Sequence, residues 1–195
     1  MKKYGDEDFI FLISEQEQEI EEEKTQVNNI YEDSVLIQGE TYEISEIMII
    51  EDGFTMRIPK AFVKMPKEIA RIKYPSSQRP DIIWSNEETT VNIAFTYKEE
   101  LLEDEETKEL RDAMKGILLK VNPSIREVKC NCLTVEQKTI ASLEFVSSAL
   151  DEEIYNLMFF FSLKGRLLMG TFNCVYSEKE NWLDIFWQMM KSIHF

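Results

Sequence analysis

The chain has 195 residues, 44% of them hydrophobic, with 37 acidic against 22 basic residues and a formal net charge of −15 at pH 7. This length and apolar content predict one domain with a substantial core, because a second compact domain would have little chain left. The negative charge repels phosphate backbones and disfavours nucleic-acid binding, and no apolar run reaches the about 18 residues of a membrane span.

The acidic residues are concentrated at the start of the chain. Residues 1–34 hold eleven acids against three lysines, and we interpret them as a solvated arm that precedes a single domain over residues 35–195. Within the arm, the apolar run Phe9 to Ile13 is a candidate edge strand. A docking surface for a basic partner protein is the functional alternative for the acidic run, and its candidate residues are Glu17, Glu19, Glu21, Glu22 and Glu23.

Short strands and one short helix are predicted in the first half of the domain. Asp52-Gly53 stands between apolar runs and predicts a hairpin with a type I′ turn, since that turn needs two residues tolerant of positive φ. A short helix is expected from Pro66 to Ile72, ahead of a loop from Ser76 to Pro80. The strands predicted by apolar alternation are residues 35–37, 42–44, 47–50, 54–58, 82–84 and 91–97.

A long helix is predicted in the middle of the chain. Acids at Glu103 to Glu106 suit the positive end of its dipole, and Asn122-Pro123 is its stop signal. The apolar stripe that should face the core consists of Leu110, Met114, Ile117, Leu118 and Val121.

The last third predicts an antiparallel meander. Alternation indicates strands over residues 128–132 and 141–145, and Leu168 to Tyr176 share one face of a last strand. The run from Ile154 to Leu163 is apolar on both faces, as in a central strand that is covered on each side. Lys164 to Arg166 supply a short hairpin between the last two strands.

A helix is then predicted over the final residues. Ser177 and Glu180 match the capping box, in which each side chain accepts a hydrogen bond from the backbone amide of the other. The residues that recur at helical spacing, and that should therefore be buried, are Trp182, Ile185, Phe186, Met189 and Ile193.

Residues able to carry catalysis or bind a metal are sparse. The only histidine is His194, and the sequence has neither a Gly-rich phosphate loop nor a nucleophile elbow. Cys130 and Cys132 form a single C-x-C pair with no second pair, whereas zinc sites need about four ligands at recognisable spacings. We therefore interpret the cysteines as buried apolar residues and expect no metal, no cofactor and no enzymatic activity.

The order of these elements resembles the PsbP-like family, which includes photosystem II PsbP, a Ran-binding nuclear factor and bacterial DcrB-type proteins. The similarity covers about residues 35–195: an N-terminal hairpin leads to the strand Phe54 to Pro59, and a short helix, two strands, a long helix, a meander and a terminal helix follow. The resemblance implies a binding scaffold, since members mostly act by docking to other proteins, and some bacterial relatives resemble chaperones of secreted effectors.

The predicted fold class is therefore α+β, a largely antiparallel sheet covered by two principal helices in an α/β/α sandwich. The expected function is a non-catalytic domain that binds another protein. Since Met1 to Asp8 lack a secretory-signal pattern, we expect it in the cytoplasm of a bacterial-type cell. The alternatives are a secretion or effector chaperone, favoured by an exposed apolar groove, and a small-ligand or enzymatic site, favoured by a closed pocket between sheet and helix.

Overall fold

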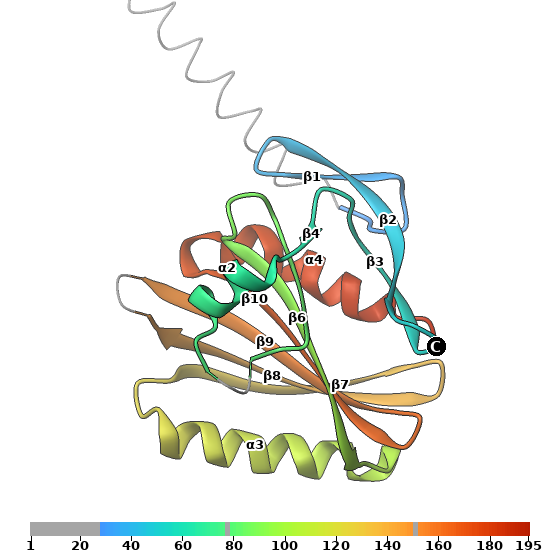
Figure 1. The fold of residues 1–195 in the computed structure, drawn as a ribbon, viewed down its shortest axis with the longest axis vertical. Helices are drawn as coiled ribbons and strands as arrows, with labels where there is room; N and C mark the ends of the chain where they lie inside the picture. The colour runs from blue at the N-terminus through green and yellow to red at the C-terminus, as the bar shows by residue number, and fades with distance from the viewer. Residues whose placement is uncertain (1–27, 77–78, 150–151) are drawn as a thin grey trace, which may run out of the picture.

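The computed structural model describes residues 28–76, 79–149 and 152–195. Within these residues the strands form two antiparallel sheets (Figure 1). The main sheet has seven strands in the order β4-β5-β6-β10-β9-β8-β7, and the small sheet has three in the order β1-β2-β3. The strands are β1 Ser34–Ile37, β2 Glu40–Ile50, β3 Phe54–Pro59, β4 Val63–Lys64, β5 Ile82–Ser85, β6 Val91–Leu101, β7 Arg126–Val135, β8 Lys138–Ser148, β9 Glu153–Leu163 and β10 Arg166–Val175.

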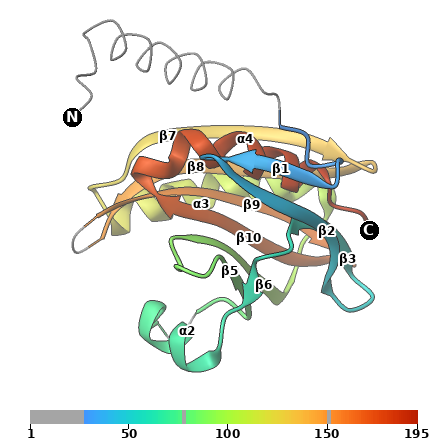
Figure 2. The ribbon, with the colours of Figure 1, turned by 90° about the horizontal axis from the view of Figure 1, so that it is seen from above.

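The helices cover both faces of the main sheet. In the described residues they are α2 (Lys67–Lys73), α3 (Thr107–Val121) and α4 (Lys179–Lys191). Figures 1 and 2 show α3 along one face of the main sheet and α4 against the other, with the small sheet beyond α4. The α+β class and its two long covering helices are confirmed. The separate small sheet, which adds a layer outside α4, was not predicted.

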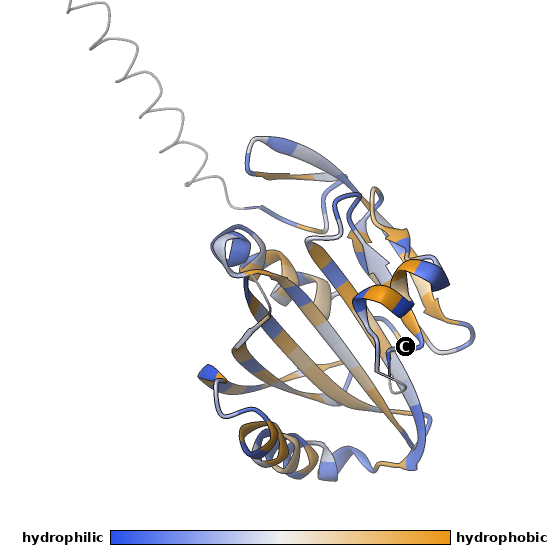
Figure 3. Ribbon diagram, turned by 60° about the vertical axis from the view of Figure 1, so that its left-hand side comes forward, coloured by the Kyte–Doolittle hydropathy of each residue, from blue (hydrophilic) through white to orange (hydrophobic). Residues whose placement is uncertain are grey.

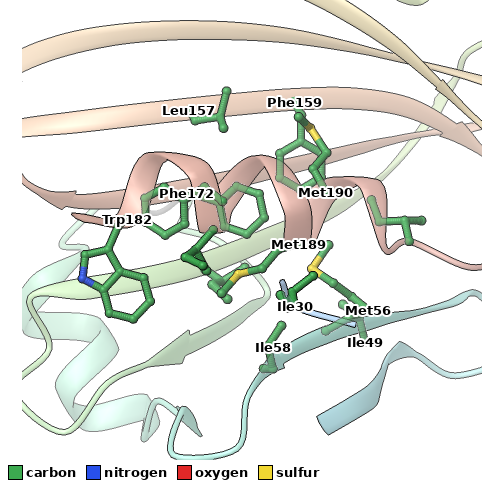
Figure 4. Packing of buried hydrophobic residues seen from close by; sticks show 14 of the residues in the cluster. Ile30, Ile49, Met56, Ile58, Leu157, Phe159, Phe172, Trp182, Met189 and Met190 are labelled. Carbon is green, nitrogen blue, oxygen red and sulfur yellow. The ribbon is translucent and has the colours of Figure 1, made fainter. Parts of the chain in front are cut away.

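The largest core lies around α4, between the two sheets. Figure 4 shows Trp182, Met189 and Met190 of this helix, with Phe172 of β10 on one side and Ile58 of β3 on the other. Every residue of the predicted terminal stripe is buried, which confirms that prediction. Aromatic rings continue the packing from helix to sheet, because Phe186 stacks on Phe172 at 5.0 Å between ring centroids.

The start of α4 differs from the prediction. The helix begins at Lys179 after the 3-10 turn Tyr176–Glu178, and its first residues have no side-chain cap. Ser177 lies inside that turn, so its hydroxyl is not at the N-cap position and the predicted capping box is wrong. A capping interaction occurs instead before α3, where the backbone amide of Glu103 donates to the Glu106 carboxylate at 3.2 Å.

The second face of the main sheet is covered by α3 at one end and by α2 at the other. Leu110, Met114 and Leu118 of α3 pack on this face, as the stripe predicted. Ile117 and Val121 are 53% and 78% exposed, because they lie at the margin of the stripe and turn away from the sheet. The predicted apolar face of this helix was therefore too wide.

The hairpins confirm the turn positions but not every turn type. Lys164 and Gly165 both have positive φ (52° and 75°), as do Gln38 and Gly39 (53° and 76°), as a type I′ turn requires. In the hairpin between β2 and β3 only Asp52 has a positive φ, so the type I′ turn predicted there is wrong. The following glycine, Gly53, is needed for space, since a Cβ on it would lie 2.8 Å from Ile50 Cγ2.

Residues 28–30 pack against the rest of the domain, although they lie inside the segment that the sequence assigns to the arm. The Asn28 side chain accepts from the Leu36 amide at 2.8 Å and donates to the Leu36 carbonyl at 2.6 Å. Ile30 is fully buried, and its amide donates to Gln188 of α4 at 2.9 Å. These bonds fix residues 28–30 between β1 and α4.

Candidate functional site

The centre of the main sheet is only partly covered on the face that carries α2 and α3. Along β9 and β10, buried and half-exposed residues alternate, so one face of each strand is sealed against α4 and the other is not. Figure 3 shows the corresponding alternation of apolar and polar residues along the strands. We call this area the open face; its half-exposed residues are Asn156, Met158, Met169, Thr171 and Asn173.

Strand pairing places the open-face residues side by side. Thr171 is opposite Met158 and Asn173 is opposite Asn156 in the β9–β10 register, while Met169 is one pleat further along. The flanking helices pack at either side of this row. The α3 cluster includes Met158 and Met169 only as partly buried neighbours, and the α2 cluster is formed by Met65, Ala70, Ile83 and Ala94.

Hydrogen bonds hold the amides of the open face in place. Asn92 donates to the Asn173 side chain at 2.9 Å, and Asn156 donates to the Ser147 hydroxyl at 3.1 Å. Tyr74, at the end of α2, also hydrogen-bonds Asn173; burial raises the pKa of this tyrosine and the bond partly opposes the rise. The open face therefore has ordered amide groups beside two thioether side chains.

The side chains of the open face offer both polar and apolar contacts. Asparagine and threonine side chains donate and accept hydrogen bonds at neutral charge, and methionine adapts its shape to an apolar partner. Among the five residues of the open face, Thr171 carries the one hydroxyl, and none is a histidine, cysteine or carboxylate.

The sequence analysis missed the open face. It treated Ile154 to Leu163 as covered on both sides, and the structure confirms this only for the half of the strand next to α3, where Phe160 and Ser162 are buried. The signal that could have revealed it was the polar residue at alternate positions of two central strands, Asn156 in β9 and Thr171 and Asn173 in β10.

A second polar cluster lies where the end of α4 meets β3 and the β7–β8 turn. His194 contacts the Glu136 carboxylate, which raises the pKa of the imidazole and lowers the pKa of Glu136. The adjacent Ser192 hydroxyl donates to the Met189 carbonyl at 2.7 Å and accepts from the Arg57 amide at 3.0 Å. Through these two bonds Ser192 connects the end of α4 to β3.

The cysteines only partly match their predicted role. Cys174 is buried in the core around α4, and Cys130 is half-buried on the α3 side of the sheet. Cys132 is exposed on edge strand β7, so it is not a core residue. All three are free thiols. In the described part of the chain, no three His, Cys, Asp or Glu residues are grouped as a metal site would need.

The predicted docking carboxylates Glu17, Glu19, Glu21, Glu22 and Glu23 lie outside the described residues, as does the candidate edge strand over residues 9–13.

The fold is similar to three solved structures. One is the solution structure of cyanobacterial PsbP (CyanoP) from Synechocystis sp. PCC 6803, with a TM-score of 0.55, 12% identity, and coverage of 77% of this chain and 91% of that chain. LpqN, involved in cell envelope biogenesis of Mycobacterium tuberculosis, has a TM-score of 0.49 at 10% identity, covering 80% and 92%. PA94 from Pseudomonas aeruginosa, a putative regulator by its description, has a TM-score of 0.43 at 10% identity, covering 76% and 94%.

At these identities the likeness concerns the fold, and the chain has the PsbP-like fold that its element order indicated. No protein-family model and no curated protein sequence matches the chain. Across residues 28–76, 79–149 and 152–195, no helix is both long and apolar enough to cross a membrane.

Proposed function

We propose that the chain is a non-catalytic domain that binds another protein through the open face. The observation that carries this proposal is the half-exposure of Met158, Met169 and Thr171, which lie on the central strands of a seven-stranded sheet. Antiparallel sheets often leave one face in water, but here helices pack on both sides of the exposed row and the row includes two methionines, so we interpret it as a contact surface.

The chemistry of the open face defines the kind of partner segment. Met158 and Met169 offer adaptable apolar contact, while Asn156 and Asn173 supply amides that pair with backbone or polar side chains. A peptide or helix with one apolar side and polar flanks meets both requirements. The partner would lie between α2 and α3, in contact with the side chains of β9 and β10.

Site-specific photo-crosslinking tests this proposal in the native cell. We would replace Thr171 with p-benzoylphenylalanine and, as the matched control, Ile117 on the outer side of α3, which is 53% exposed. We expect one protein to be crosslinked at position 171 and not at position 117, and Met169→Arg to reduce its recovery without changing the thermal midpoint. Equal crosslinking at both positions, or unchanged recovery with Met169→Arg, would refute binding at the open face.

A secretion or effector chaperone is the second candidate, favoured by the paired methionines. Unbranched thioether side chains accommodate many apolar sequences, which is a property of surfaces that bind unfolded clients. The two candidates differ in the state of the partner. A chaperone would hold its partner in a protease-sensitive, unfolded form, whereas a docking domain would bind a folded protein whose protease resistance is unchanged.

We also propose cytoplasmic residence. Free Cys130, Cys132 and Cys174 suit a reducing compartment, where disulfides are rare. Cell fractionation with an antibody to the domain tests this, and recovery in a membrane or exported fraction would refute it.

A further inference from the structure

A pocket of about 290 Å³ lies at the other end of the main sheet, between β4, α2 and the segment that leads into β5. Four basic side chains line it, and they come from three separate parts of the fold. Lys64 belongs to β4, Lys67 and Arg71 lie one helical turn apart on α2, and Arg79 precedes β5. The fold therefore brings basic side chains from β4, α2 and the segment before β5 to the same pocket.

This pocket reverses the charge of the rest of the molecule. The whole chain carries −15, yet residues 59–80 contain six basic residues and a single acid, Glu68. Asp81 is the one carboxylate among the residues that line the pocket, and its Oδ2 accepts the backbone amide of Tyr97 at 3.1 Å. The pocket thus has four basic side chains and one carboxylate, and that carboxylate already accepts a backbone hydrogen bond.

Among residues 28–76, 79–149 and 152–195, none forms an ion pair with Lys64, Lys67, Arg71 or Arg79. Arg79 donates through Nε to the Tyr74 carbonyl at 3.0 Å, a bond that positions the guanidinium and leaves its charge uncompensated. Like charges gathered around a hollow repel one another, and a multivalent anion removes that repulsion when it binds.

Local helix stability explains only part of this arrangement. Arg71 lies in the last turn of α2, where a cation suits the helix dipole. Lys67 is in the first turn and forms a like-charge i,i+4 pair with Arg71, which disfavours the helix. Lys64 and Arg79 are outside the helix altogether. The grouping of these four basic side chains therefore lowers local stability in the free protein, and a bound anion would compensate for their repulsion.

We propose that this pocket binds a small organic phosphate. Arg71 and Arg79 present guanidinium groups that can each bind a phosphate through two hydrogen bonds, and Lys64 and Lys67 add point charges. A carboxylate carries one negative charge, whereas a phosphate monoester carries nearly two and fits the excess of cations better.

The floor of the pocket suits the organic part of such a ligand. Met65, Ala70 and Ile83 belong to the small buried cluster between α2 and the sheet and also line the hollow. The volume of about 290 Å³ lies just below the range of about 300 to 1,000 Å³ for small-molecule sites, which limits the ligand to a few carbon atoms or one ring beside the phosphate. The site is separate from the open face and does not depend on a protein partner.

Titration followed by NMR tests the proposal with defined probes. We would add phenyl phosphate, inorganic phosphate and benzoate to the full chain and follow the amides of Ala70 and Ile83. We expect saturable shifts with phenyl phosphate, weaker binding of inorganic phosphate because it lacks contact with the apolar floor, and weaker binding of benzoate because it carries a single negative charge.

Variants separate a specific site from general attraction to a basic surface. Arg71→Gln and Arg79→Gln should each weaken phenyl phosphate binding by about tenfold, the loss expected for one charge-assisted contact. Arg71→Lys should weaken phenyl phosphate binding less, because lysine keeps the positive charge and loses only the paired hydrogen bonds of the guanidinium. Lys60→Gln is the control, since Lys60 pairs with Glu43 at 2.9 Å and does not line the pocket.

The outcomes decide the proposal. Thermal midpoints of the variants within a few degrees of the parent would show that binding, not folding, has changed. Absence of saturable shifts with phenyl phosphate, equal affinity for benzoate, or equal weakening by Lys60→Gln would each overturn the assignment.

Discussion

The ring of Phe159 lies directly over the Cα of Gly170 on the neighbouring strand. The two residues are paired in the β9–β10 register, and a Cβ on Gly170 would lie 2.0 Å from Phe159 Cζ. Because Phe159 is fully buried and also stacks on Phe172, it has no space to move aside. We expect Gly170→Ala to destabilise the fold by about 3 kcal/mol, the upper range for an overpacked core, as measured by urea denaturation.

Gly116 is the matched control for that substitution. It lies inside α3, and no atom stands within 4 Å of the position that its Cβ would take. Gly116→Ala should stabilise the protein by about 0.5 to 1 kcal/mol, because alanine loses less conformational freedom in a helix. Equal effects of the two substitutions would contradict the steric explanation.

Trp182→Ala should destabilise the fold by about 3 to 5 kcal/mol, the cost of a large cavity in a core. The side chain is 1% exposed and its ring lies 5.5 Å from Tyr42 and 5.6 Å from Phe62, so it joins α4 to the small sheet and to the segment that follows it. Ile72→Ala, at a side chain that is 80% exposed, should change stability by less than about 0.5 kcal/mol. A loss below about 1 kcal/mol for Trp182→Ala would show that α4 does not secure the core.

His194 should titrate above the ordinary imidazole pKa of 6.5, because the Glu136 carboxylate favours its charged form. As the only histidine, it gives a single set of imidazole signals in a pH series followed by NMR. Glu136→Gln should return its pKa toward 6.5. A midpoint that the substitution leaves unchanged would disprove the pairing.

The same pair makes stability depend on pH in a defined direction. The raised pKa of His194 contributes stability that is complete below 6.5 and is lost as pH rises through the folded value, while the lowered pKa of Glu136 contributes stability above 4.5 that is lost in acid. The difference in thermal midpoint between the parent and Glu136→Gln should therefore be largest between pH 4.5 and 6.5.

The three thiols should react with a disulfide reagent in an order set by burial. Cys132 is exposed and should react first, and Cys132→Ser should remove the fast phase. Burial raises the pKa of Cys174 to about 12, so this thiol should stay protected until the protein unfolds. Rapid modification of Cys174 in the native protein would show that the core around β10 opens readily.

Substituting glutamine for Glu17, Glu19, Glu21, Glu22 and Glu23 together should leave the thermal midpoint within a few degrees, because surface substitutions usually change stability by about 0.5 kcal/mol or less. If these carboxylates bind a basic partner, the same variant should lose salt-sensitive capture of that partner. Capture that persists at low salt would remove the docking role, and a large drop in the midpoint would assign them to structural pairs.

Local periodicity predicted the helices and most of the strands. Bulky residues at helical spacing, such as Trp182 and Phe186, leave little ambiguity about which side of a helix is buried. Alternation worked equally well for β7 and β8. These patterns depend only on residues that are close in the sequence, so they can be recognised without knowledge of the tertiary structure.

The arrangement of those elements in space was not predictable in the same way. The assembly of the seven-stranded sheet depends on β6 pairing with β10, far along the chain, and no local pattern encodes that pairing. The open face was missed because the exposure of polar residues such as Thr171 depends on where the flanking helices α2 and α3 pack. The basic pocket was missed because its cations are dispersed among apolar residues, although the scarcity of acids between residues 59 and 80 was visible.

The position of α4 between the two sheets has a consequence for synthesis. The small sheet is made early, yet the residues that cover its inner face, including Met189 and Ile193, are made last. While the chain is growing on the ribosome, β1, β2 and β3 can form their hairpins but cannot bury Met56 and Ile58 against their native partners. We therefore expect nascent chains stalled before residue 179 to expose this apolar surface and to be the forms most prone to aggregate.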